Sequence, residues 1–315
     1  MTDREILVLR QKIHGTDADV YRDELARLLP DCEVRFAQTP AEEKRYLQTA
    51  DVATGFALSA DQLALAENLD LFACVFAGTD HLDLDAFAEQ DVAVTNASGV
   101  HQANMSEYVV GALVTLSRQF MRAWRQKQQR VWQSYPVCEL QDSTVAVVGM
   151  GAIGGAVVSR LDAFGVESVG VRYTPEKGGP TASTYGFDEI HEAVADADAV
   201  VVACRLTDET EGLIDGDVLR TMPTDAFLIN VARGPVVDTD ALVDTLQTNG
   251  IAGAALDVTD PEPLPEDHRL WGFENVFITP HNAGNSPNYF RRRAEILAEN
   301  VAKLDSGADL TNHVR

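Results

Sequence analysis

The chain has 315 residues, of which 45% are hydrophobic, so its length favours two domains with cores of ordinary size. No apolar run approaches the roughly 18 residues that a membrane span requires, and residues 1–15 lack the basic start and apolar stretch of a signal peptide. The 49 acidic residues outnumber the 25 basic ones and leave a formal net charge of −24, which argues against the basic face that nucleic acids need. We therefore expect a cytoplasmic protein that binds neither membranes nor nucleic acids.

The basic residues are unevenly divided, because only five are lysines and the other twenty are arginines. An acidic, lysine-poor surface is typical of adaptation to high salt, where screening weakens the repulsion between carboxylates. The alternative is an acidic protein of a low-salt organism. The four cysteines are far apart and form no CxxC pair, so we expect neither a disulfide framework nor a metal site; they are Cys32, Cys74, Cys138 and Cys204.

Strand-like runs alternate with helical patterns along the chain, which predicts βαβ units and parallel sheets. In the first third, strands are expected at residues 5–10, 32–36, 52–55, 71–76 and 92–96, with a helix over 19–29. One long helix is expected from about Ala103 to about Trp132. Further strands are expected at 144–148, 168–173, 199–204, 226–231, 252–258 and 276–279, before a last helix over 288–304 that packs back on the first lobe.

A glycine-rich turn follows the strand at 144–148 and opens a helical stretch, with the sequence GMGAIG over 149–154. Glycines at this spacing permit a tight turn, a close approach of the backbone to a pyrophosphate, and close packing of helix on sheet. The free N–H groups and positive end of the helix attract the pyrophosphate. The turn therefore predicts NAD(P) binding by Gly149, Gly151, Ala152, Ile153 and Gly154.

The residue at the end of the next strand indicates which dinucleotide binds. An acidic side chain is expected there for the ribose 2′-hydroxyl of NAD, whereas this chain has Arg172, followed by Tyr173 and Thr174. A guanidinium can pair with a 2′-phosphate and stack on adenine. We therefore predict that NADP(H) is preferred and that NAD(H) is also possible; the alternative is a surface arginine beside a site that prefers NAD(H).

Three later segments, at 229–238, 255–264 and 278–284, place Arg233, Glu262 and His281 at or after the ends of predicted parallel strands. Ligands of open α/β sheets bind at this edge. Arg233 can hold and polarise a carboxylate-bearing keto substrate. His281 can donate a proton to the oxygen that a hydride makes negative, and Glu262 can bond the other imidazole nitrogen.

With the glycine turn, these segments resemble the D-2-hydroxyacid dehydrogenase family over essentially the whole chain. Members are D-isomer specific, NAD(P)-dependent oxidoreductases that act on CH–OH groups and interconvert 2-oxo acids and (R)-2-hydroxy acids. The resemblance implies a homodimer, and the composition suggests a haloarchaeal member. We expect an α/β protein of two Rossmann-like or flavodoxin-like lobes with parallel sheets, in which the cofactor lobe (102–287) is inserted in a discontinuous substrate lobe (1–101 plus 288–315).

The resemblance also implies further binding residues. The loop at 76–80 would bind the substrate carboxylate through the backbone of Gly78 and Thr79, although its Thr-Asp-His continuation departs from the family pattern and puts substrate choice in doubt. Val100, His101 and Met105 would line the substrate pocket. Val231 and Ala232 are expected to lie against the cofactor. Asp257 would contact the nicotinamide carboxamide, and Ala283 and Gly284 would flank the nicotinamide.

A second departure concerns the segment after the fourth strand of the cofactor lobe. The family commonly has a Leu-Pro-Leu-Thr type of sequence here, whereas this chain has Cys204 followed by Arg205. We expect Arg205 to join Arg172 at the 2′-phosphate of NADP(H); the alternative is an exposed side chain without a ligand.

Several related functions remain open as alternatives. A glyoxylate/hydroxypyruvate reductase would differ only in its substrate. Phosphoglycerate dehydrogenase is disfavoured because no regulatory domain is appended, and formate dehydrogenase because its relatives carry Gln where this chain has Glu262. The non-enzymatic alternative is a dinucleotide-sensing corepressor, which an intact catalytic set disfavours.

Overall fold

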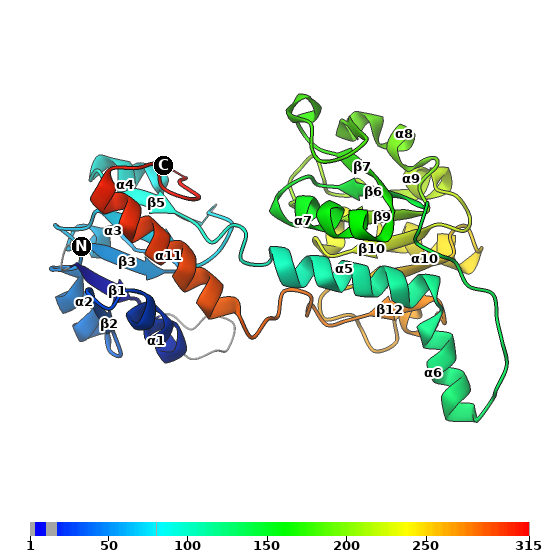
Figure 1. Cartoon of the computed structure of the whole chain (residues 1–315), viewed down its shortest axis with the longest axis horizontal. Coiled ribbons are helices and arrows are strands. Elements are labelled where there is room, and N and C mark those ends of the chain that lie inside the picture. The colour runs from blue at the N-terminus through cyan, green and yellow to red at the C-terminus, as the bar shows by residue number, and fades with distance from the viewer. Residues whose placement is uncertain (1–3, 11–17, 80, 315) are drawn as a thin grey trace. The chain divides into compact units, whose positions relative to one another are not determined.

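The computed structural model describes residues 4–10, 18–79 and 81–314 (Figure 1). The chain forms two compact units, of which one comprises Met1–Val100 and Ser286–Arg315 and the other His101–Asn285. The second unit is thus inserted in the sequence of the first. Each unit is an α/β structure built on one parallel sheet, which confirms the expected fold class.

The first unit contains a five-stranded sheet with the order β2-β1-β3-β4-β5. Its strands are β1 (Glu5–Val8), β2 (Glu33–Phe36), β3 (Val52–Gly55), β4 (Leu71–Cys74) and β5 (Ala93–Thr95). Its helices are α1 (Ala18–Leu28), α2 (Pro40–Leu47), α3 (Ala60–Leu63), α4 (Leu84–Glu89) and α11 (Tyr289–Ser306). All four residues of β3 and of β4 are buried, as expected of central parallel strands with both faces covered.

Alternation along β1 divides the core of this unit into two layers. Leu7 belongs to the layer that includes Phe72, whereas Ile6 and Val8 belong to the opposite layer, because successive side chains of a strand point to opposite faces. The second layer also contains Leu297 and other apolar residues of α11. The last helix therefore packs on the first sheet, as the sequence predicted.

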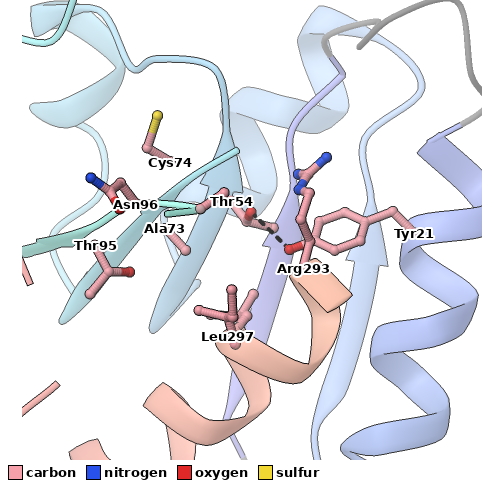
Figure 2. Close-up of a pocket in the computed structure, with 10 residues that line it drawn as sticks. Tyr21, Thr54, Ala73, Cys74, Thr95, Asn96, Arg293 and Leu297 are labelled. Carbon is pink, nitrogen blue, oxygen red and sulfur yellow. Dashed lines mark hydrogen bonds between the residues drawn. The ribbon is translucent and has the colours of Figure 1, made fainter. Parts of the chain in front are cut away.

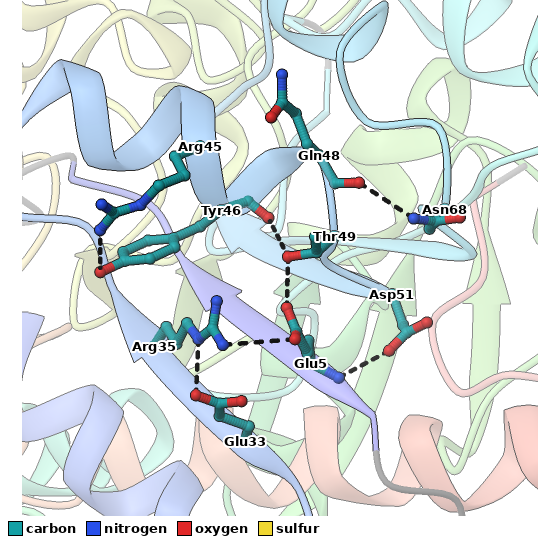
Figure 3. Close-up of polar contacts among 9 residues, drawn as sticks. All are labelled: Glu5, Glu33, Arg35, Arg45, Tyr46, Gln48, Thr49, Asp51 and Asn68. Carbon is teal, nitrogen blue, oxygen red and sulfur yellow. Dashed lines mark hydrogen bonds and ion pairs between the residues drawn. The ribbon is translucent and has the colours of Figure 1, made fainter.

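Polar side chains hold the edge of this sheet together (Figure 3). Glu5 accepts a hydrogen bond from Thr49 Oγ1 at 2.5 Å and pairs with Arg35 at 3.4 Å, while its backbone N–H donates to Asp51. Arg35 also pairs with Glu33 at 2.8 Å, and the Arg35 guanidinium holds the pKa of the Glu33 carboxyl below its usual value. These exposed pairs fix the edge strand β2 with little net stabilisation.

The second unit contains a seven-stranded sheet with the order β12-β11-β10-β9-β6-β7-β8, all of it parallel. Its strands are β6 (Thr144–Val148), β7 (Glu167–Val171), β8 (Ser183–Tyr185), β9 (Ala199–Val202), β10 (Phe227–Asn230), β11 (Gly253–Leu256) and β12 (Val276–Ile278). Its α-helices are α5 (Gln102–Ser117), α6 (Phe120–Gln129), α7 (Ala152–Leu161), α8 (Ile190–Val194), α9 (Gly216–Thr221) and α10 (Thr239–Gln247). Short 3₁₀ helices lie at Asp162–Phe164, Pro175–Lys177, Phe187–Glu189, Gly234–Val236 and Arg269–Gly272.

The expected single helix over 103–132 is wrong, because the chain forms two helices, α5 and α6. Gln119 lies between them in the left-handed region, at φ 52°. Leu113 of α5 is fully buried in a layer shared with α7 and β6, whereas α6 has no buried residue. The amphipathic pattern that ties α5 to the core thus ends near Leu116, and the chain turns away there.

The strand β8 was not expected from the sequence. Its three residues are only half-buried, since it lies at the edge of the sheet, and it lacks the apolar run that marks the central strands. None of the helices in the part of the chain that the structure describes is long and apolar enough to cross a bilayer.

Candidate active site

The polar residues singled out in the sequence of the second unit line one edge of its sheet. All seven strands run parallel, so their carboxyl ends lie at the same edge, where ligands of open sheets bind. In order across the sheet, the residues that follow the strands are Arg172 after β7, the glycine turn after β6, Cys204 and Arg205 after β9, Arg233 after β10, Asp257 after β11 and His281 after β12.

This edge is too long for one small ligand. Neighbouring strands lie about 4.8 Å apart, so the five intervals from β7 to β12 span roughly 24 Å. Arg172 and His281 lie at opposite ends of this row. A molecule that reaches both ends must be extended.

Each of the three glycines in the glycine turn meets a different steric requirement. Gly149 has a φ of +104°, and a Cβ there would lie 2.4 Å from the backbone nitrogen of Cys204. A Cβ on Gly154 would lie 2.0 Å from the carbonyl oxygen of Gly149. A Cβ on Gly151 would meet no protein atom within 4 Å, so this glycine leaves space beside the backbone that the protein itself does not fill.

The N-terminus of α7 lies at the same open space. Gly151 is its N-cap, and no side chain caps the helix there. Free N–H groups at a helix start attract anions, so the turn fits the pyrophosphate of a dinucleotide. Gly151, Ala152 and Ile153 are the residues that would hold it.

Arg172 and Arg205 follow strands on either side of the glycine turn. Arg172 is half-buried and donates from Nη1 to the carbonyl oxygen of Gly178 at 2.6 Å, which folds its side chain over the following turn. Tyr173 is 75% exposed, and Arg205 is exposed. Burial raises the pKa of Cys204 to about 11, so its thiol stays protonated at neutral pH and packs in the turn.

His281 and Glu262 contact each other directly. Nδ1 of His281 lies 3.0 Å from Oε2 of Glu262, while Oε1 of Glu262 accepts the backbone N–H of Thr259 at 3.1 Å. The Thr259 N–H therefore orients the carboxylate toward the imidazole. Both side chains are 40–49% exposed, so the second imidazole nitrogen can reach a ligand.

The turn that carries Arg233 is held in place by a buried side-chain amide. Asn230, 1% exposed, accepts the N–H of Ala232 at 3.0 Å and donates to the carbonyl oxygen of Arg233 at 3.1 Å. A Cβ on Gly234 would lie 2.0 Å from the carbonyl oxygen of Thr259. The Arg233 turn and the segment that carries Glu262 therefore approach each other at backbone distance.

Asp257 holds the turn that carries His281. It is 2% exposed, and its Oδ1 accepts from Thr279 Oγ1 at 2.5 Å and from the N–H of Asn282 at 2.7 Å. Its Oδ2 accepts the N–H of Ala283 at 2.9 Å, and its carbonyl oxygen accepts the N–H of His281 at 2.8 Å. His281 has a φ of 51°, a conformation that a side-chain-bearing residue adopts only when its surroundings hold it.

Helix α5 supports the same turn with two side chains four residues apart. Tyr108 lies 2.7 Å from Thr279 Oγ1, and because Thr279 donates to Asp257, the Tyr108 hydroxyl must be the donor to Thr279. Burial raises the pKa of Tyr108 to about 12, so this proton stays in place. Asn104 donates to the carbonyl oxygen of Ala283 at 2.8 Å.

These supporting residues were missed in the sequence. Asn230 ends a buried strand, and Tyr108 lies on a helix that faces the core. The one feature of the sequence that could have indicated either residue was a polar side chain in an apolar segment. Their partners are distant in sequence, as the separation of 171 residues between Tyr108 and Thr279 shows. The contact implied between Asp257 and a nicotinamide stays a prediction; what the structure shows is its bonding to the 279–283 turn.

The residues implied for substrate binding fall in both units. In the first unit, Gly78 and Thr79 are half-buried in the loop after β4, and Val100 is 1% exposed; Asp80 lies outside the described residues. In the second unit, Met105 is part of the α5 core, and the His101 ring lies 3.8 Å from where a Cβ on Gly284 would be. Within the described ranges, no group of three or more His, Cys, Asp or Glu side chains could hold a metal ion.

Known proteins resemble this chain over its whole length. A family model for the D-isomer specific 2-hydroxyacid dehydrogenase NAD binding domain matches residues 110–283. A glyoxylate reductase of Thermofilum pendens is 34% identical over 79% of this chain and 76% of that protein. The human glyoxylate reductase/hydroxypyruvate reductase is 35% identical over 75% and 74%, respectively. The crystal structure of a D-isomer specific 2-hydroxyacid dehydrogenase from Xanthobacter autotrophicus Py2, in complex with NADPH and MES, has a TM-score of 0.80 at 27% identity and covers 100% of this chain and 98% of that one.

Replacing Asp257 by Asn tests the support of the His281 turn. An amide nitrogen cannot accept a hydrogen bond, so one buried N–H, of Asn282 or Ala283, loses its partner. We expect the free energy of unfolding to fall by about 1–3 kcal/mol, measured by urea denaturation, and these amides to exchange hydrogen at least roughly fivefold faster. The exposed control Glu266→Gln should change neither quantity, and equal stability of both variants would contradict the role of Asp257.

Proposed function

Because this chain belongs to the D-isomer specific 2-hydroxyacid dehydrogenase family, we propose that it reduces a 2-oxo acid to the (R)-2-hydroxy acid with NADP(H), through Arg233, Glu262 and His281. The family makes the chain an oxidoreductase that acts on hydroxyacids. The observation that carries the assignment of roles is the 3.0 Å contact between His281 Nδ1 and Glu262 Oε2 at the carboxyl edge of the sheet.

His281 acts as the general acid in reduction and as the base in the reverse direction. Glu262 accepts a hydrogen bond from Nδ1–H of His281, which leaves Nε2 to donate a proton to the substrate oxygen. A bound nicotinamide supplies the hydride. The Thr259 N–H holds the Glu262 carboxylate in place.

Arg233 binds and polarises the substrate. Its guanidinium can form two parallel hydrogen bonds to a carboxylate and can place positive charge beside the keto oxygen. The Asn230 amide fixes the backbone from which it projects. We assign the unit of Met1–Val100 and Ser286–Arg315 to the substrate, with the backbone of Gly78 and Thr79 as a second carboxylate contact and Val100, His101 and Met105 beside the substrate side chain.

NADP(H) is the proposed cofactor because the positively charged Arg172 follows β7, where an acidic residue is expected in a site for NAD(H). The glycine turn would hold the pyrophosphate, and Arg172 and Arg205 would bind the 2′-phosphate. Val231, Ala232, Asp257, Ala283 and Gly284 would border the nicotinamide half. The Xanthobacter relative, which was solved with NADPH, supports this assignment.

Glyoxylate and hydroxypyruvate are the first substrates to consider. Two relatives at 34–35% identity are named for the reduction of these 2-oxo acids. Because the loop departs from the family pattern at Thr79, other 2-oxo acids remain candidates. High salt is the proposed working condition, on the formal net charge of −24 and the scarcity of lysine.

The proposed homodimer has a surface that fits it. Several large apolar side chains on α6 and just after it are exposed, namely Phe120, Trp124, Val131, Trp132 and Val137. Such clusters are typical of protein interfaces. A second copy of this chain is the partner that we propose for them.

The role of His281 is tested by His281→Ala in assays of NADPH oxidation at high salt with a panel of 2-oxo acids. We expect kcat to fall by roughly 10²–10⁴-fold, the usual contribution of a general acid, with little change in the KM for NADPH. Glu262→Gln should cost less, because the amide oxygen still accepts from Nδ1. The surface control His191→Ala should retain full activity, and a His281→Ala enzyme within a few-fold of wild type would refute the mechanism.

Cofactor choice is tested by Arg172→Asp, compared through kcat/KM for NADPH and NADH. The variant loses a charge-assisted hydrogen bond to the 2′-phosphate and gains repulsion between that phosphate and the new carboxylate. The ratio of kcat/KM for NADPH to kcat/KM for NADH should therefore fall by roughly 10–150-fold. Arg205→Ala should lower kcat/KM for NADPH by about tenfold without affecting NADH. The exposed control Arg269→Ala should leave the ratio unchanged; an unchanged ratio in Arg172→Asp would show that NADP(H) is not recognised here.

The dimer is tested by placing charge on the exposed apolar cluster. Burial of a carboxylate at an apolar interface is unfavourable, so we expect Trp124→Asp to shift the sedimentation-derived mass from that of two chains to that of one. Trp271, which is 54% exposed, offers the matched control Trp271→Asp, which should stay dimeric. A monomeric wild type, or a Trp124→Asp dimer as tight as wild type, would contradict the proposal.

A further inference from the structure

Arg293 of α11 is a buried cation whose two terminal nitrogens form no hydrogen bond with the described residues. It is 3% exposed, and among the described residues nothing accepts a hydrogen bond from its Nη1 or Nη2. Aromatic rings surround it instead, with the guanidinium carbon 4.2 Å from the ring centre of Tyr21 and 5.2 Å from that of Tyr289. Ring faces attract a cation but accept no strong hydrogen bonds, so the terminal nitrogens remain unsatisfied.

The Arg293 side chain lines a cavity at the carboxyl ends of β3, β4 and β5 (Figure 2). Thr54, Cys74 and Asn96 line it from these strands. Its volume is about 10 Å³, which is close to what one particle of the size of a water molecule needs. The space thus suits a single small particle and is too small for a sugar, a nucleotide or a carboxylic acid.

Among the described residues that line this cavity, none is acidic. An arginine stays charged in proteins, and a buried charge without a counter-charge is costly. Burial raises the pKa of the Cys74 thiol and of the Tyr289 phenol, although the charge of Arg293 acts in the opposite direction on both. Neither group therefore supplies the missing negative charge at neutral pH.

Three residues with hydroxyl groups, Tyr21, Thr54 and Thr95, also line the cavity. Tyr21 Oη and Thr54 Oγ1 lie 3.3 Å apart. One of the two donates to the other, so one hydroxyl proton remains to be donated elsewhere. The cavity thus offers guanidinium N–H groups, the remaining O–H group of this pair and the Thr95 hydroxyl, and the described residues that line it include no carboxylate.

We propose that this cavity binds a small monovalent inorganic anion, with chloride as the ligand, held by the terminal nitrogens of Arg293 and by the Tyr21–Thr54 hydroxyl pair. A chloride ion is larger than a water molecule, so the lining side chains must move apart slightly to hold it, and it accepts hydrogen bonds from all sides. It supplies the charge that a water molecule lacks.

The anion also has a structural consequence for the first unit. Asn96 and Ala97, which line the cavity, bond the carbonyl oxygens of Ala77 and Phe76 in the loop after β4. Neutralising Arg293 therefore stabilises the core beneath that loop. This inference does not depend on the proposed reaction, since it concerns the stability of the fold.

The first test is thermal unfolding in sodium chloride and in sodium gluconate at equal sodium concentration. Equal sodium removes the general effect of salt on an acidic chain, and gluconate is too large for the cavity. Each tenfold increase in chloride above its dissociation constant should raise the Tm of the wild type by about 3–5 °C more than gluconate does. Arg293→Met should lose this chloride-specific rise and be at least as stable as the wild type in gluconate.

Arg291→Met is the matched control. Arg291 lies on the same helix, but it is about half exposed and pairs with Glu295 at 3.3 Å. The variant removes the same charge outside the cavity, so its chloride-specific rise in Tm should equal that of the wild type. An identical response to chloride in Arg293→Met and Arg291→Met would overturn the proposal.

The second test needs no variant and therefore stands even if Arg293→Met does not fold. Wild-type crystals grown in sodium bromide should show an anomalous peak within hydrogen-bond distance of the terminal nitrogens of Arg293. Density for water alone, without an anomalous peak, would show that the cavity is merely hydrated and would overturn the proposal. Neither test requires turnover, so failure here and failure of the proposed reaction are distinguishable.

Discussion

The parallel direction of all seven strands in the unit of His101–Asn285 is the constraint on which the site depends. Parallel strands place every carboxyl end at one edge, so residues from 149 to 281 of the sequence meet along a single row. Three backbone approaches tighten this row, at Gly149, Gly154 and Gly234, where any Cβ would overlap backbone atoms. The chemistry at the edge is thus a consequence of the packing of the sheet.

The buried charges of Asp257 and Arg293 differ in the hydrogen bonds that they form. The Asp257 carboxylate is almost fully buried, and its two oxygens accept three hydrogen bonds. These three hydrogen bonds stabilise a turn in which His281 has a left-handed backbone conformation. Arg293 is equally buried, but its terminal nitrogens have no acceptor in the described part of the chain. A satisfied buried charge fixes geometry, whereas an unsatisfied one requires a ligand.

Acidic side chains and exposed apolar side chains are unevenly distributed over the surface. Most of the acidic residues are on a solvated surface, which favours solubility in salt. On α6 and the segment after it, aromatic side chains face outward, with Trp132 fully exposed. Two of the three tryptophans, Trp124 and Trp132, are exposed in this segment.

The sequence by itself determined the parts of this protein that local patterns encode. Strand-like runs between helical patterns located eleven of the twelve strands that the structure describes, because such runs follow from hydrophobic periodicity. The glycine spacing between strand and helix located the turn at 149–154, because glycine allows backbone conformations that other residues rarely adopt. The tertiary structure decided what depends on partners far apart in the chain. It broke the expected long helix at Gln119, added the edge strand β8 and bonded Tyr108, Thr279 and Asp257 into one support. It also left the terminal nitrogens of Arg293 without an acceptor among the described residues. Such contacts arise only when distant segments pack, and no local pattern records them.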